Sequence, residues 1–146
     1  MKLFLNLMGI LVVILGLLSG LTIPLSFDAS AQEGPGVSHV SPEELKHLIE
    51  SRADIEVVDT QPKGAYEIGH VKGAVNFPWA ADIKNPGRLP RNKELVLYCD
   101  CTHEEDSLDT AKQLMTKFGY TNVKVLEGGW SRWQNLGYPT EKGKAK

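Results

Sequence analysis

The sequence predicts an α/β domain with a parallel β-sheet and helices on both of its faces. Short apolar segments rich in β-branched residues alternate along the chain with segments whose apolar residues recur at helical spacing. The segment 95–98 (Leu-Val-Leu-Tyr) is apolar throughout, which is typical of a strand buried on both faces in a parallel sheet. Ligands bind such sheets beyond the carboxyl ends of the strands, so the residue that follows this segment, Cys99, is the first candidate for function.

The first element of the domain is a helix that begins at Ser41. Ser41 can cap it, Pro42 suits its first position, and Glu44 completes a capping box, while Leu45, Leu48 and Ile49 form an apolar stripe. The other expected elements are strands at 55–58, 74–77, 95–98 and 123–126, helices at 62–68, 107–118 and 129–136, and a long loop at 79–92.

The N-terminal segment has the pattern of an export signal. Lys2 precedes an apolar stretch at 3–18, and Ala29-Ser30-Ala31 is a small-residue cleavage site, so residues 1–31 are expected to be a signal peptide. The alternative is an uncleaved membrane anchor, since 3–27 is long enough to span a bilayer. Either outcome places the domain outside the cytoplasm, periplasmic or extracellular. We expect a linker at 32–36, the domain at 37–140 and a polar tail at 141–146.

Composition excludes some classes of function. The formal net charge is −2 and the pI is about 6.1, which provide no basic face for nucleic acid. Two cysteines are too few for a disulfide framework, and they stand close together, with only Asp100 between Cys99 and Cys101.

Three stretches, in this order, resemble the rhodanese-like family. They are Asp59 followed by 66–78 (Tyr-Glu-Ile-Gly-His-Val-Lys-Gly-Ala-Val-Asn-Phe-Pro), the strand 95–98 leading into Cys99, and 119–139 with its Gly-Tyr, Gly-Gly, Trp and Gly-Tyr-Pro. The resemblance implies a parallel sheet of about five strands. It also implies transfer of a sulfane sulfur through a cysteine persulfide at the end of the central strand. A small sulfur donor or acceptor, or a thiol, would be the partner. No cofactor, no nucleic acid and a monomer are expected, with membrane contact only through an uncleaved N-terminal segment.

The cysteine loop departs from the family pattern. The family's loop is shorter, often contains a glycine and ends in an arginine, whereas this loop contains neither. Its residues, in order, are Cys99, Asp100, Cys101, Thr102, His103, Glu104, Glu105, Asp106 and Ser107. Carboxylates beside a thiol raise its pKa and repel a dianion such as thiosulfate. The same carboxylates suit the first turn of the next helix, and Asp106 and Ser107 stand where a cap belongs.

Either cysteine matches the family's in one respect. Cys99 follows the strand directly, while Cys101 has the family's spacing to Ser107. We expect Cys99 to be the nucleophile and Cys101 to be a resolving or sulfur-relay partner. Asp59 and His70 are possible supporting residues, with a structural hydrogen bond the favoured role of His70.

A second arginine that the family commonly has near its site, besides the one at the end of the loop, is also absent from this sequence. Gln61 stands where the family commonly has an arginine two residues after the acid. Arg88 and Arg91 in the long loop are candidate replacements, although solvated surface positions are the favoured interpretation for both.

Three other functions remain open for the Cys-x-Cys pair. One is thiol–disulfide redox chemistry. The second is a metal site formed by Cys99, Cys101 and His103, which is a weak pattern because no distant fourth ligand accompanies it. The third is a non-catalytic rhodanese-like binding module, favoured by the missing arginine and the acidic residues.

Overall fold

The structure of the chain is a computed structural model that describes residues 36–144. The predicted signal peptide at 1–31 and most of the predicted linker lie outside the described residues. Within 36–144, no helix is long and apolar enough to cross a membrane.

A five-stranded sheet forms the centre of the domain. Its order is β1 (Ser38–Val40), β6 (Val123–Leu126), β5 (Glu94–Tyr98), β2 (Ile55–Asp59) and β4 (Val75–Asn76), and every neighbouring pair is parallel. The predicted fold class is therefore confirmed. No separate strand was predicted at β1, because Ser-His-Val is too short and too polar to give a strand pattern.

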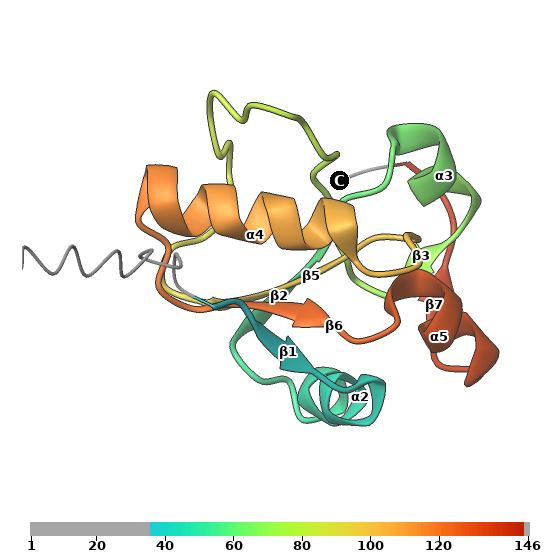
Figure 1. Cartoon of the computed structure of the whole chain (residues 1–146). Helices are drawn as coiled ribbons and strands as arrows, with labels where there is room; N and C mark the ends of the chain where they lie inside the picture. The colour runs from blue at the N-terminus through green and yellow to red at the C-terminus, as the bar shows by residue number, and fades with distance from the viewer. Residues whose placement is uncertain (1–35, 145–146) are drawn as a thin grey trace, which may run out of the picture. The chain divides into compact units, whose positions relative to one another are not determined.

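Helices cover both faces of the sheet, as Figure 1 shows. They are α2 (Pro42–Glu50), α3 (Lys63–Ile68), α4 (Glu105–Phe118) and α5 (Gly129–Asn135). Alternate residues of β5 point to opposite faces: Leu95 and Leu97 pack in the cluster with α4, and Val96 and Tyr98 pack in the cluster with α2, α3 and α5. Burial on both faces explains why β5 is apolar at nearly every position.

The first helix is capped as predicted, but the start of α4 is not. Ser41 Oγ accepts a hydrogen bond of 3.1 Å from Glu44 N–H. The prediction that Asp106 and Ser107 cap the next helix is wrong, because α4 begins at Glu105 and its N-cap is Glu104 in the left-handed conformation (φ 54°). Ser107 lies inside the first turn, where its Oγ donates to Glu104 O at 2.9 Å.

A second, two-stranded sheet fastens the C-terminal segment to the domain. β3 (His70–Val71) pairs antiparallel with β7 (Thr140–Glu141). Glu141, expected in a polar tail, accepts Gly73 N–H at 2.9 Å and lies 3.3 Å from His70 Nε2. Two-residue strands are too short to show an alternating pattern, so no local feature of the sequence predicts this pairing of β3 with β7.

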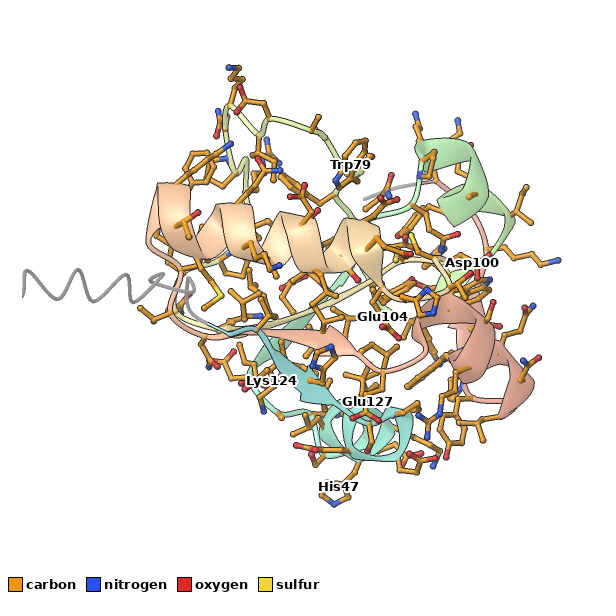
Figure 2. All side chains as sticks on the ribbon, viewed as in Figure 1. His47, Trp79, Asp100, Glu104, Lys124 and Glu127 are labelled. Atoms are coloured by element: carbon orange, nitrogen blue, oxygen red, sulfur yellow. The ribbon has the colours of Figure 1, made fainter. Side chains whose placement is uncertain are left out.

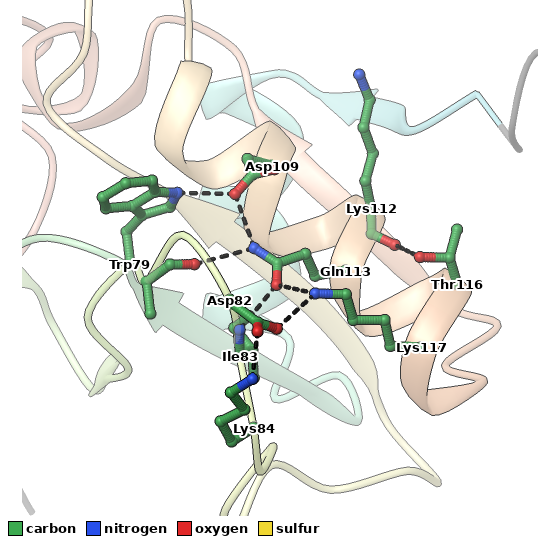
Figure 3. Close-up of polar contacts among 10 residues, drawn as sticks. Trp79, Asp82, Ile83, Lys84, Asp109, Lys112, Gln113, Thr116 and Lys117 are labelled. Atoms are coloured by element: carbon green, nitrogen blue, oxygen red, sulfur yellow. Dashed lines mark hydrogen bonds and ion pairs between the residues drawn. The ribbon is translucent and has the colours of Figure 1, made fainter.

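The long loop is fastened along α4 by the polar network of Figure 3. Trp79 Nε1 donates to Asp109 at 2.8 Å, and Gln113 accepts Ile83 N–H at 2.8 Å. Asp82 accepts from Lys84 and Lys117, and these hydrogen bonds lower the pKa of Asp82 to about 2.

Neither loop arginine reaches the cysteines. Arg91 donates to Phe118 O at 2.6 Å, at the opposite end of α4 from the cysteine loop. Arg88 lines a separate cleft beside Phe77 of the loop that follows β4. These two residues therefore do not replace the positive charge that the family carries at its site.

A buried hydrogen bond joins the two central strands immediately before the cysteine loop. Tyr98 and Asp59 are register partners in β5 and β2, and Tyr98 Oη donates to Asp59 Oδ2 at 2.6 Å. The same hydroxyl accepts Val71 N–H of β3 at 3.0 Å. One phenol thus holds three strands together in a region that excludes water.

We predict that Tyr98→Phe lowers the free energy of unfolding by about 1–3 kcal/mol, because it removes one of the hydrogen bonds to the buried Asp59 carboxyl and the acceptor of the Val71 N–H. Urea unfolding followed by circular dichroism measures the change. Tyr138→Phe is the matched control, since the described structure gives the Tyr138 hydroxyl no hydrogen bond and uses only its ring, packed edge-on against Trp133. Equal stabilities of the two variants would contradict the structural role assigned to Tyr98.

Candidate functional site

Cys99 follows β5 directly and is buried, with 1% of its surface exposed. Its sulfur has two polar neighbours: Cys101 N–H donates to Sγ at 3.4 Å, and Ser107 Oγ lies 3.6 Å away. The one hydroxyl hydrogen of Ser107 is already donated to Glu104 O, so Ser107 accepts from the Cys99 thiol in this arrangement.

The backbone of Cys99 lies against the turn between β6 and α5. Trp130 N–H donates to Cys99 O at 2.8 Å. A Cβ atom placed on Gly129 would lie 2.2 Å from the same oxygen, and Gly129 also has a φ of +51°. Only glycine permits this approach, which gives a physical reason for the Gly-Gly of the sequence pattern.

The acidic residues of the loop are arranged for hydrogen bonding. Glu104 Oε1 accepts Gly128 N–H at 2.7 Å, which ties the cysteine loop to the same turn a second time. Glu105 accepts its own N–H and that of His103, and these contacts lower the pKa of the Glu105 carboxyl. Asp100 Oδ1 accepts from Ser131 Oγ of α5 at 2.5 Å. Figure 2 labels Asp100 and Glu104, which lie near the first turn of α4 and near α5. Glu105 and Asp106 thus lie in the first turn of α4, where acidic residues are favourable, but no side chain caps the helix.

Cys101 is half-buried and lies between Cys99 and the start of α4. Burial, followed by its hydrogen bond with the Cys99 thiol, raises the pKa of Cys101 to about 12. A hydrogen bond from the N–H of Asp106 lowers the pKa of Cys101, but this effect is smaller than that of burial. Cys101 is therefore a thiol at neutral pH, and a thiol is a much weaker nucleophile than a thiolate.

In the described structure, Asp59 and His70 make no hydrogen bond to the sulfur of Cys99, and Asp59 reaches the site only through Tyr98, the residue before Cys99. Burial raises the pKa of the Asp59 carboxyl, against the opposing hydrogen bonds from Tyr98 and Gln61. Gln61 donates both its backbone N–H (2.8 Å) and its side-chain amide (3.2 Å) to Asp59. A neutral amide thus meets this carboxyl at the position where the family commonly has an arginine.

The His70 ring is stacked on Tyr66, with ring centroids 3.7 Å apart. His70 Nδ1 lies 2.8 Å from Tyr66 O and Nε2 lies 3.3 Å from Glu141 Oε1. Both nitrogens are engaged in fastening α3 and β7, which is the structural role that the sequence favoured for His70.

A cleft of about 390 Å³ opens beside the cysteine loop. Its walls come from the loop, α3, α5 and the C-terminal segment, and its lining residues are Gln61, Ala65, Ile68, Gly69, Asp100, Trp130, Gln134, Thr140 and Lys142. Sequence reasoning missed Lys142, because it falls in the expected tail and only the pairing of β7 with β3 brings it to the cleft.

The remaining residues of the cysteine loop do not form a metal site in the described structure. Thr102 and His103 are exposed, and His103 Nδ1 lies 3.5 Å from Glu105. Between residues 36 and 144, no group of three or more His, Cys, Asp or Glu side chains is arranged to hold a metal ion.

The fold and the site together are typical of one protein family. The features are the strand order, the cysteine at the end of β5 and the contact of the Gly-Gly turn with that cysteine. A model of the rhodanese-like domain matches residues 41–136, and the chain belongs to this family. Solved structures agree at the level of fold: the BH2092 protein of Bacillus halodurans has a TM-score of 0.65 at 23% identity, covering 72% of this chain and 77% of that one.

The curated relatives include proteins named for sulfur chemistry. Sulfur carrier protein TtuD of Thermus thermophilus is 32% identical over 101 residues, which cover 58% of this chain and 35% of that protein. Thiosulfate sulfurtransferase of Pseudomonas aeruginosa is 30% identical over 129 residues, which cover 69% of this chain and 46% of that protein. The chain spans less than half the length of these relatives.

We predict that alkylation of Cys101 by iodoacetamide in the folded protein rises about tenfold per pH unit from about pH 8 to pH 11, because its pKa is about 12. Peptide mass spectrometry separates Cys101 from Cys99. The same chain unfolded in urea is the control, and its rate should level off soon after about pH 9, near the ordinary pKa of cysteine. A plateau near pH 9 in the folded protein would show that burial does not hold this thiol protonated.

Proposed function

We propose that this protein carries sulfur: Cys99 accepts a sulfane sulfur as a persulfide and passes it to a small thiol. The observation that carries the proposal is the position of Cys99 at the end of the central strand, with Cys101 N–H and Ser107 Oγ beside its sulfur. The names of the relatives, a sulfur carrier and a sulfurtransferase, support the same chemistry.

The residues around Cys99 supply what a sulfur anion needs. Cys101 N–H already donates to the sulfur, and the Ser107 hydroxyl donates once it turns from Glu104 O. Hydrogen-bond donors aimed at a buried sulfur stabilise negative charge on it. Cys99 is the proposed nucleophile because these groups surround its sulfur, whereas the raised pKa of Cys101 keeps that residue a thiol.

Electrostatics favour a donor other than thiosulfate. Gln61 is neutral, Arg88 and Arg91 lie elsewhere, and the loop contributes several carboxylates. A dianion approaching Cys99 is repelled by these groups. We further propose export of the protein to the periplasm or the exterior, on the pattern of residues 1–31.

We predict that incubation with inorganic polysulfide adds one sulfur atom to the intact protein, that Cys99→Ser abolishes the adduct, and that Cys101→Ser retains it. Intact-protein mass spectrometry before and after a reductant measures the adduct. Thermal melts of both variants check that they are folded. An adduct that survives Cys99→Ser and disappears in Cys101→Ser would transfer the nucleophile's role to Cys101.

A second function, redox exchange between the two cysteines, is favoured by their direct contact. The Cys101 thiol is hydrogen-bonded to Cys99, and Cys101 N–H donates to the Cys99 sulfur. With a persulfide on Cys99, attack by the Cys101 sulfur on the inner sulfur forms a Cys99–Cys101 disulfide and releases hydrogen sulfide. Without the persulfide, a disulfide oxidant removes two protons and two electrons from the two thiols and is itself reduced to two thiols.

We predict that a disulfide oxidant lowers the mass of the protein by two hydrogens, reversibly, and that either cysteine substitution prevents the change. The measurement is intact mass after equilibration in buffers of graded redox potential. If thiol accessibility is constant across those buffers, the redox function is wrong. A chain that shows neither this change nor a sulfur adduct, and that co-purifies with a partner, would be a binding module instead.

A further inference from the structure

The cleft beside the cysteine loop has one cation and one carboxylate in different walls. Lys142 follows β7, and its segment is held against α3 because Gly143 N–H donates to Glu67 O at 3.1 Å. Asp100 belongs to the cysteine loop and is held toward α5 by Ser131 Oγ. The two charges therefore come from elements that are separately anchored.

Both charges are available to a ligand. Within residues 36–144, neither Lys142 nor Asp100 takes part in an ion pair, and Asp100 Oδ2 is left over after Oδ1 accepts from Ser131. The neighbouring cation Arg132 differs in this respect, because it pairs with Glu43 and Glu127.

The rest of the lining suits a small organic molecule. Ile68 is 74% exposed and stands in the cleft wall with Trp130, and Gln61 adds a neutral amide. A single cation without a second positive group is poorly matched to an inorganic dianion. One cation and one anion flanking apolar surface match a ligand that carries both charges.

We propose that this cleft binds a zwitterionic thiol of the amino-acid type, with its carboxylate at Lys142 and its ammonium group at Asp100. This proposal rests on the proposed function, for which it names the sulfur acceptor. Asp100 lines the cleft and adjoins Cys99 in the chain, so an ammonium group bound at Asp100 holds the ligand beside the cysteine loop.

The transfer step balances without an oxidant. The acceptor thiolate attacks the outer sulfur of the Cys99 persulfide, a new sulfur–sulfur bond forms, and the bond to Cys99 Sγ breaks. The electron pair of the broken bond leaves on Cys99 as thiolate, and the proton stays on the transferred sulfur. The products are the persulfide of the acceptor and the Cys99 thiolate. The Cys101 N–H and the Ser107 hydroxyl stabilise this thiolate.

Binding of unreactive thioethers tests the cleft separately from sulfur transfer. S-methylcysteine carries both charges, 2-(methylthio)ethylamine lacks the carboxylate, and 3-(methylthio)propionate lacks the ammonium group. We predict that the wild-type protein binds S-methylcysteine about threefold to fivefold more tightly than either truncated ligand, as expected for one solvent-exposed charge pair. Titration followed by NMR chemical shifts measures the three affinities.

Two substitutions assign the charges to their residues. Lys142→Gln should lower the affinity for S-methylcysteine to that of the wild-type protein for 2-(methylthio)ethylamine. The affinity for 2-(methylthio)ethylamine itself should not change. Asp100→Asn should weaken it to the level of 3-(methylthio)propionate. Lys112→Gln is the matched control, because Lys112 is an exposed lysine of α4 outside the cleft lining and its loss changes the net charge equally.

Equal affinity of the wild-type protein for all three ligands, or equal effects of Lys142→Gln and Lys112→Gln, would overturn the proposal. A failure of the proposed function would look different: the Cys99 sulfur adduct would be missing from the wild-type protein while the charge-dependent binding persisted.

Discussion

The cysteine loop depends on the contact between its first residue and the turn that precedes α5. Trp130 N–H meets Cys99 O, and Gly129 lies so close to that oxygen that no side chain fits between them. Glu104 joins the same turn through Gly128 N–H. Two points of attachment to one rigid turn define where the loop starts and where it enters α4, and the environment of the cysteine sulfur follows from them.

The balance of charge distinguishes this site from the pattern that the family resemblance implied. A neutral glutamine satisfies the buried Asp59, and the carboxylates of the loop accept backbone N–H groups of the protein itself. The described residues that surround the cleft contribute only Lys142 as a cation. Such a site suits ligands of low net charge better than a dianion.

Much of the fold could be predicted from the sequence, because the burial that stabilises the sheet is recorded in its pattern. β5 is apolar at consecutive positions since both of its faces are covered, and Ser41 stands where a helix needs a cap. The clasp of β3 and β7 could not be predicted, because pairing of two-residue strands depends on contacts between distant segments.

The candidate site was predictable in part for the same reason. The position of Cys99 follows from strand patterning, but the directions of the loop side chains do not. Glu104 looked like one of several helix-capping acids, and its left-handed backbone instead sends its carboxylate to another segment. Lys142 lines the cleft because β7, which precedes it, pairs with β3. No local sequence pattern predicts that pairing.

The double attachment of the cysteine loop confines variation to a short stretch. Between the anchor at Cys99 O and the anchor at Glu104, residues 100–103 contribute no strand or helix, and side chains of Ser131 and Glu105 hold them to α5 and α4. The sheet, α4 and the glycine turn thus position the loop, while residues 100–103 supply its chemical character. Substitution within residues 100–103 is therefore expected to change the charge and reactivity of the loop while both anchors stay in place.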